Sequence, residues 1–123
     1  MRAMLASVVL LLVATAAHGA TDALDEVNAA RARRGLPPFQ RDSSLSIAAS
    51  KAADFRAARH MAGHTSNDFA FVPNGSRAGA AGCAAWTPDF GWGSCCTYEQ
   101  WRYAGAAWAM GRDGRRYMHL YVR

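Results

Sequence analysis

Apolar positions in the first half of the chain recur at the spacing of two helices. Between Asp22 and Arg34 they gather on one face, with acidic residues in the first turn and arginines in the last. This charge order complements the helix dipole. Gly35 is a typical helix end, and two prolines follow Leu36, so the helix cannot resume. The pattern predicts a first helix over residues 22–34.

The second helical pattern begins at Asp42 or Ser43, since either side chain can cap a helix. Its apolar positions are mostly small, and they are Leu45, Ala48, Ala49, Ala52 and Phe55. Small side chains on a buried face let a helix approach its neighbouring layer closely. The exposed face is expected to carry the basic side chains Lys51, Arg56 and Arg59.

Between Gly63 and Tyr98 the apolar positions show neither the spacing of a helix nor the alternation of a strand, and glycine and proline are frequent. The segment is predicted to be an irregular loop that is functional, held by a disulfide, or both. A β-hairpin is predicted after it, with strands over 103–110 and 116–122 and a glycine-rich turn between them. Both faces of the second strand are apolar, so we expect that strand to lie inside a layered structure.

The first twenty residues have the composition of a secretory signal peptide. Arg2 precedes an apolar run from Met4 to Ala17, and small residues suited to cleavage follow. A membrane anchor is the alternative, but a spanning helix needs about 20 strongly apolar residues and this run is shorter. The sequence predicts a leader over 1–20 and a single secreted, extracellular or periplasmic domain over 21–123, with no membrane span after cleavage.

The charge of the chain favours no particular partner. The formal net charge is +5, and arginine carries almost all of the positive charge because Lys51 is the only lysine. The arginines are scattered, and no aromatic-basic motif of a nucleic-acid-binding protein accompanies them. We therefore expect no nucleic-acid partner. Solubility and weak attraction to acidic polymers explain the charge, and the partner is expected to be an unknown extracellular ligand or protein.

The three cysteines lie close together in sequence, at Cys83, Cys95 and Cys96. In an oxidising compartment two of them are expected to pair, which leaves one over. A bridge between adjacent cysteines would distort the peptide between them. The expected disulfide therefore joins Cys83 to Cys95 or to Cys96. Metal ligation is the alternative, although the chain has no CxxC pair.

Several local motifs in the first half resemble one known family. These are Asn28-x-x-Arg31, the helix exit Arg34-Gly35-Leu36-Pro37, the restart Asp42-x-x-Leu45, and the closing His64-Thr65. Over residues 24–65 the chain resembles the N-terminal half of a CAP domain, the superfamily of cysteine-rich secretory proteins, antigen 5 and plant pathogenesis-related proteins, in its compact bacterial form. The C-terminal hairpin resembles the final strands of the same fold. The resemblance implies an α+β fold, a three-layer α-β-α sandwich with a small antiparallel sheet.

The resemblance also implies a cleft with two histidines and two acidic residues, and here the chain departs from the family. His64 matches the first histidine by position. The segment 77–85 contains no acidic residue where the family has a glycine-glutamate-asparagine motif. Trp92-Gly93-Ser94 is similar to the family's approach to the second histidine, but Cys95-Cys96 follows it in place of a histidine. The cleft is therefore predicted to be degenerate. We expect no cofactor and zinc binding no tighter than about micromolar.

Four residues are the candidates for a cleft: His64, Asp68, Glu99 and His119. Each has a structural alternative. His64 can be a loop histidine that bonds the backbone, and His119 can be a core histidine whose nitrogens are satisfied. Asp68 and Glu99 can be solvated loop charges.

Aromatic residues form a second candidate surface, for a sugar or a peptide, at Trp86, Trp92 and Trp101. The same side chains can instead fill a small core. No signature of a cysteine or serine hydrolase surrounds a suitable nucleophile. The sequence therefore favours a secreted, non-enzymatic binding or interaction module. A metal- or thiol-dependent hydrolase and a purely structural extracellular protein are the alternatives.

Overall fold

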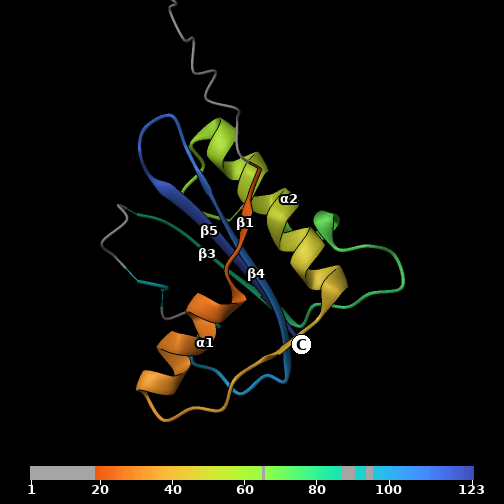
Figure 1. The fold of residues 1–123 in the computed structure, drawn as a ribbon. Helices are drawn as coiled ribbons and strands as arrows, with labels where there is room; N and C mark the ends of the chain where they lie inside the picture. The colour runs from red at the N-terminus through yellow and green to blue at the C-terminus, as the bar shows by residue number, and fades with distance from the viewer. Residues whose placement is uncertain (1–18, 65, 87–90, 94–95) are drawn as a thin grey trace, which may run out of the picture.

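A sheet with one helix on each face organises the described part of the chain, which comprises residues 19–64, 66–86, 91–93 and 96–123 of this computed structural model (Figure 1). The elements are β1 (Thr21–Asp22), α1 (Leu24–Arg33), β2 (Gln40–Arg41), α2 (Ser43–Arg59), a 3₁₀ turn (Asp68–Phe71), β3 (Ala80–Trp86), β4 (Tyr103–Met110) and β5 (Arg116–Val122). Among these residues, no helix has the length and apolar character to cross a bilayer. Residues 1–18 of the expected leader lie outside the described ranges.

The C-terminal hairpin is the centre of the sheet. The sheet has the order β1-β4-β5-β3, and the two-residue β2 adds a short parallel pairing to β4. β4 and β5 pair antiparallel from Ala104 opposite Val122 to Met110 opposite Arg116, as the sequence predicted. Residues 117–122 of β5 are all buried. The expectation that this strand lies inside a layered structure is confirmed.

β3 corrects the prediction of an irregular loop over 63–98. It pairs antiparallel with β5 along its whole length, from Ala80 opposite Val122 to Trp86 opposite Arg116. Its sequence is mostly alanine and glycine, which have weak intrinsic preference for strands and no clear alternation of apolar and polar positions. The pairing with β5 therefore determines this strand, and local sequence does not.

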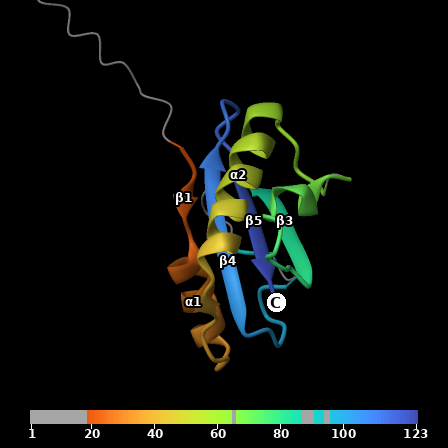
Figure 2. The same ribbon diagram turned by 90° about the vertical axis from the view of Figure 1, so that its right-hand side faces the viewer.

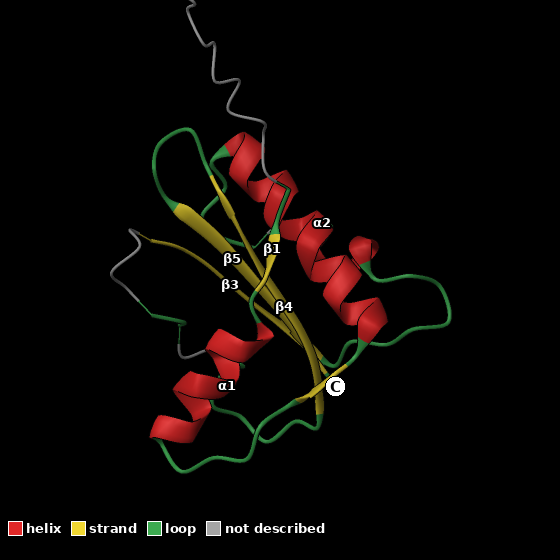
Figure 3. Ribbon diagram, in the orientation of Figure 1, coloured by secondary structure: helices red, strands yellow, loops and turns green. Residues whose placement is uncertain are grey.

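Alternate residues of the sheet face different helices, which makes three layers (Figures 2 and 3). The face toward α2 buries Ala107, Ala109, Tyr117 and Tyr121 together with the apolar side of the helix. The face toward α1 buries Ala104, Ala106, Leu120 and Val122 with Leu24 and Val27. The predicted α+β class and the α-β-α sandwich are confirmed.

α2 begins and ends where its sequence allows. The carboxylate of Asp42 accepts a hydrogen bond from the Leu45 backbone N–H at 3.0 Å, which confirms Asp42 as the cap. The helix ends at His60, whose φ of 52° lies in the left-handed region. Its buried alanines let it lie so close to β4 that a Cβ atom on Gly105 would stand 2.1 Å from the backbone of Leu45. Only glycine fits this approach.

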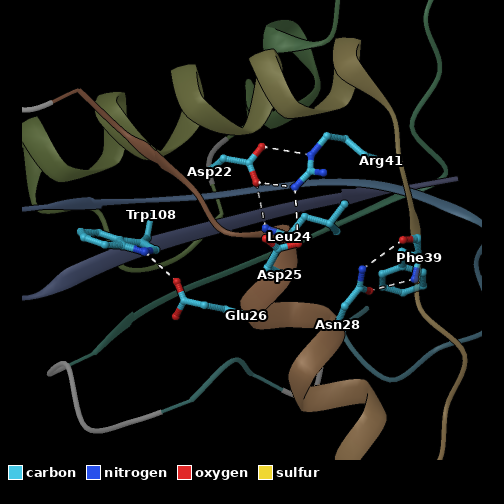
Figure 4. Close-up of polar contacts among 8 residues, drawn as sticks. All are labelled: Asp22, Leu24, Asp25, Glu26, Asn28, Phe39, Arg41 and Trp108. Carbon is cyan, nitrogen blue, oxygen red and sulfur yellow. Dashed lines mark hydrogen bonds and ion pairs between the residues drawn. The ribbon is translucent and has the colours of Figure 1, made fainter.

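Polar contacts hold α1 against the sheet and the following loop (Figure 4). The amide of Asn28 donates to the backbone oxygen of Phe39 at 3.1 Å and accepts from its N–H at 2.8 Å. The indole N–H of Trp108 donates to Glu26 at 2.8 Å. The helix itself is shorter than predicted, since Asp22 belongs to β1 and accepts from the N–H of Leu24 at 3.1 Å.

Replacing Gly105 by alanine tests the close approach of α2 to the sheet. The new methyl group would overlap backbone atoms, which cannot move as a side-chain tip can, so we expect Gly105→Ala to lower the free energy of unfolding by about 3 kcal/mol. Gly63→Ala is the control, because no heavy atom lies within 4 Å of a Cβ there, and its effect should stay below about 1 kcal/mol. Similar effects of the two substitutions in a denaturant titration would contradict this packing.

Candidate metal centre

Three chemically different side chains meet on the α2 side of the sheet. His64, Asp68 and Cys83 each present one potential ligand atom, and these atoms all lie within 4.8 Å of one another. Nδ1 of His64 shares a short hydrogen bond with Oδ2 of Asp68. The His64 side chain is 53% exposed, whereas the Asp68 carboxylate is buried. The group therefore extends from the surface into the interior.

The 3₁₀ turn after α2 positions the carboxylate of Asp68. The phenol O–H of Tyr121, on the central strand, donates to the backbone oxygen of Asp68. The ring of Phe71 packs edge-on against Phe55 of α2 at 5.4 Å between centroids, and Phe69 lies 6.3 Å from Tyr121. These contacts hold both ends of the turn against the helix and the sheet. A solvated loop charge was the sequence alternative for Asp68, and its burial contradicts that alternative.

Cys83 enters the group through the register of β3. It lies directly opposite His119 on β5, and its neighbours Ala81 and Ala85 pack against the core on the α2 side. Side chains alternate between the faces of a strand, so Cys83 faces α2 as well. The sequence identified this residue as a disulfide candidate, with metal ligation as the alternative. The two-residue spacing of Ala81, Cys83 and Ala85 indicates that they share one face only once the segment is known to be a strand.

Arg56 is buried beside the group, which corrects the expectation that it lies on the exposed face of α2. Its Nη1 donates to the backbone oxygen of Met118 at 2.6 Å, and Nη2 donates to the backbone oxygen of Ala62. Burial lowers the pKa of Arg56, while the nearby Cys83 and Asp68 act in the opposite direction. A cation here favours the anionic carboxylate and thiolate.

His119 lies in the interior next to these residues. It is 0% exposed, and its ring centroid is 4.6 Å from that of Tyr121. Neither ring nitrogen has a hydrogen-bond partner among the described residues. Burial lowers the pKa of His119 to about 3, Asp68 opposes this shift, and Arg56 and His64 add to it. The residue is thus a core histidine as the alternative held, but its nitrogens are not satisfied by the described chain.

Glu99, the fourth cleft candidate, lies elsewhere. Its carboxylate is exposed and accepts the indole N–H of Trp101 at 3.0 Å. Its backbone oxygen accepts from Arg31 of α1 at 2.8 Å. The structure therefore brings His64, Asp68 and His119 into one region on the α2 side, and it places Glu99 beside α1.

Two of the aromatic candidates, Trp92 and Trp101, lie on the α1 side of the sheet, whereas the group lies on the α2 side. Trp92 and Trp101 are half-buried and pack against the core cluster on the α1 side. Trp101 also lines a cavity of about 440 Å³ with Tyr103 and Arg123, while Trp92 lines a separate cavity of about 20 Å³. The side chain of Trp86 lies outside what the structure describes.

The expected disulfide stays a prediction. Cys95 lies outside the described residues. Cys96 is buried in the core on the α1 side and Cys83 is half-buried on β3. A bridge from Cys83 would occupy the sulfur that lies next to His64 and Asp68, so disulfide formation and metal ligation through Cys83 exclude each other.

The fold agrees with the comparison to known families. The sequence model described as the cysteine-rich secretory protein family, CAP, matches residues 24–119. The chain therefore belongs to the CAP family. A search of curated proteins finds no match to the chain.

Replacing Arg56 by lysine tests whether this guanidinium joins the central strand to the segment that follows α2. One ammonium group cannot reach the carbonyls of both Met118 and Ala62, so we expect Arg56→Lys to lower the free energy of unfolding by about 2 kcal/mol. Arg59→Lys is the matched control on the same helix, because Arg59 is exposed and stacks on Phe55. Equal losses for both variants in a denaturant titration would show that the guanidinium does not connect these segments.

Proposed function

We propose that this CAP domain is a secreted binding module that, with Cys83 in its thiol form rather than in the expected disulfide, holds a transition-metal ion between His64, Asp68 and Cys83. The single observation that carries the proposal is the convergence of an imidazole, a carboxylate and a thiol whose ligand atoms lie within 4.8 Å. The sequence expectation of weak zinc binding assumed that His64 has no suitable partner. Asp68 and Cys83 supply the partners that the expectation lacked.

The donor set selects the class of metal. Calcium and magnesium prefer sites made only of oxygen, whereas nitrogen, oxygen and sulfur donors together suit zinc and similar ions. The carboxylate of Asp68 has two oxygens, so its hydrogen bond to His64 leaves capacity to bind an ion. A carboxylate that contacts a histidine ring also orients that ring for metal binding. Zinc is therefore the ion proposed.

Access and charge fit an ion that enters from solvent. The half-exposed ring of His64 lies at the surface, and the buried carboxylate lies below it. The positive charge of Arg56 opposes a bound cation, but it also favours the anionic forms of Asp68 and Cys83 that the cation needs. The two negative charges of Asp68 and Cys83 as ligands exceed the single positive charge of the guanidinium.

The positions of the candidate acidic residues support metal binding rather than catalysis. A zinc hydrolase needs a general base beside the metal-bound water in addition to its ligands. Asp68 would be used as a ligand or to orient His64, and Glu99 lies beside α1. The group therefore has no second carboxylate from the candidates to serve as a base.

Thiol-dependent hydrolysis is a second candidate, favoured by the same contact. Asp68 orients His64, and Cys83 lies within reach, which is the order of orienting acid, base and nucleophile. The two functions predict opposite effects of zinc. A metal-binding site is filled by zinc, whereas a thiol hydrolase would be inhibited by it, so turnover of an activated ester that zinc blocks and Cys83→Ala abolishes would favour the hydrolase.

Secretion is proposed from the leader-like composition of residues 1–20 and agrees with the family to which the domain belongs. After expression in a secreting host, the intact mass of the released protein should correspond to a chain that begins between His18 and Thr21. Retention of Met1 in the product would contradict this part of the proposal.

Zinc titration calorimetry on the reduced mature chain tests the metal site. We expect one zinc ion per chain with a dissociation constant below about 1 µM, and His64→Ala and Cys83→Ala should each weaken binding by at least about tenfold. His60→Ala is the matched control, since His60 is exposed at the end of α2 and does not belong to the group. Weak binding by the unmodified chain, or an equal loss in the control, would refute the site.

A further inference from the structure

His119 occupies a position from which it can reach the proposed metal. It lies directly opposite Cys83 in the antiparallel pairing of β3 with β5. Directly opposed residues project from the same face of a sheet, with Cβ atoms about 4.5–5.5 Å apart. Tyr117 and Tyr121, two residues before and after His119 on β5, lie in the core on the α2 side. His119 therefore lies on the same face of the strand. The imidazole therefore lies beside the thiol, beneath the end of α2.

The imidazole of His119 is buried without a partner among the described residues. Its exposure is 0%, and both Nδ1 and Nε2 lack a hydrogen bond there. Buried polar atoms in folded proteins almost always have a partner, and an unsatisfied one destabilises the native state. A metal ion can supply the missing interaction for one nitrogen, while the other nitrogen carries the proton.

The charged and titratable groups near His119 are those of the proposed centre. Asp68 of the 3₁₀ turn, Arg56 of α2 and His64 of the intervening segment all interact electrostatically with it. His119 therefore lies among the groups of the proposed centre, and the uncharged imidazole is the form of a histidine that binds a metal.

We propose that a ring nitrogen of His119 is the fourth ligand of the ion held by His64, Asp68 and Cys83. The inference rests on the proposed function. His119 is not among the three residues whose ligand atoms lie within 4.8 Å, so its ring has to approach that group when the ion binds. Rotation of the side chain away from the tilted ring of Tyr121 provides this movement.

A fourth protein ligand changes the kind of site. Three ligands leave an open position for water, as in catalytic zinc sites, whereas four close the coordination sphere, as in structural sites. Such a site would join β3 and β5 to the 3₁₀ turn and to the segment that follows α2. The ion would then stabilise the fold and would have no position at which to activate water.

Cobalt(II) titration of the reduced mature chain distinguishes the two kinds of site, because four-coordinate cobalt absorbs visible light much more strongly than five- or six-coordinate cobalt. We expect the unmodified chain to show strong visible bands together with thiolate-to-cobalt charge transfer. His119→Gln should lose most of the visible intensity and bind cobalt at least about tenfold more weakly, while the charge-transfer band of Cys83 remains. His60→Gln, at the exposed end of α2, is the matched control and should resemble the unmodified chain.

The outcomes separate this inference from the function on which it rests. Binding by the unmodified chain that His119→Gln leaves unchanged would overturn the fourth ligand and keep the three-residue site. No cobalt binding by the unmodified chain would overturn both. If His119→Gln does not fold, the ring nitrogen resonances of His119 in the unmodified chain decide the matter during zinc titration. A shift typical of a metal-bound nitrogen supports the inference, and an unchanged ring contradicts it.

Discussion

The buried guanidinium of Arg56 is the contact on which the candidate centre depends. One of its nitrogens donates to the carbonyl of Met118 on the central strand, and another donates to Ala62 just after α2. These bonds join the helix to the sheet and direct the following segment, which carries His64, over the face where Cys83 and His119 lie. A buried cation requires such partners. Burial of Arg56 therefore depends on these two carbonyls, and its bond to Ala62 in turn fixes the position of the segment that follows α2.

The two ends of α2 meet the sheet in different ways. Near its beginning the helix touches β4 so closely that only Gly105 fits beneath Leu45, and alanines line its inner face. Near its end the long side chain of Arg56 fills the space above β5. The first contact excludes water from an apolar layer, whereas the second creates a buried polar layer in which ligands can converge.

Local sequence predicted the elements whose determinants are local. The cap at Asp42, the helix that follows it and the glycine-rich hairpin all carry their own signals, and each was found. β3 was missed because alanine and glycine carry no strand signal and its partner β5 lies about 36 residues further along the chain, at a separation that local patterns do not register.

The candidate site was predicted only in part, for the same reason. His64 and Asp68 are close in sequence, and His119 was noted as a buried histidine. Cys83 joins them only through the register of β3, and Arg56 was assigned to the exposed face because charged side chains are rarely buried. A buried arginine bound to two carbonyls leaves no trace in the spacing of apolar residues.

X-ray absorption at the zinc edge of the zinc-loaded, reduced protein tests the central claim most directly, because it reports the atoms bound to the ion. The account predicts one sulfur ligand at about 2.3 Å, from Cys83, with nitrogen and oxygen ligands at about 2.0–2.1 Å. Loss of the sulfur signal in Cys83→Ala would complete the assignment. A zinc ion surrounded only by nitrogen and oxygen in the unmodified protein would contradict it.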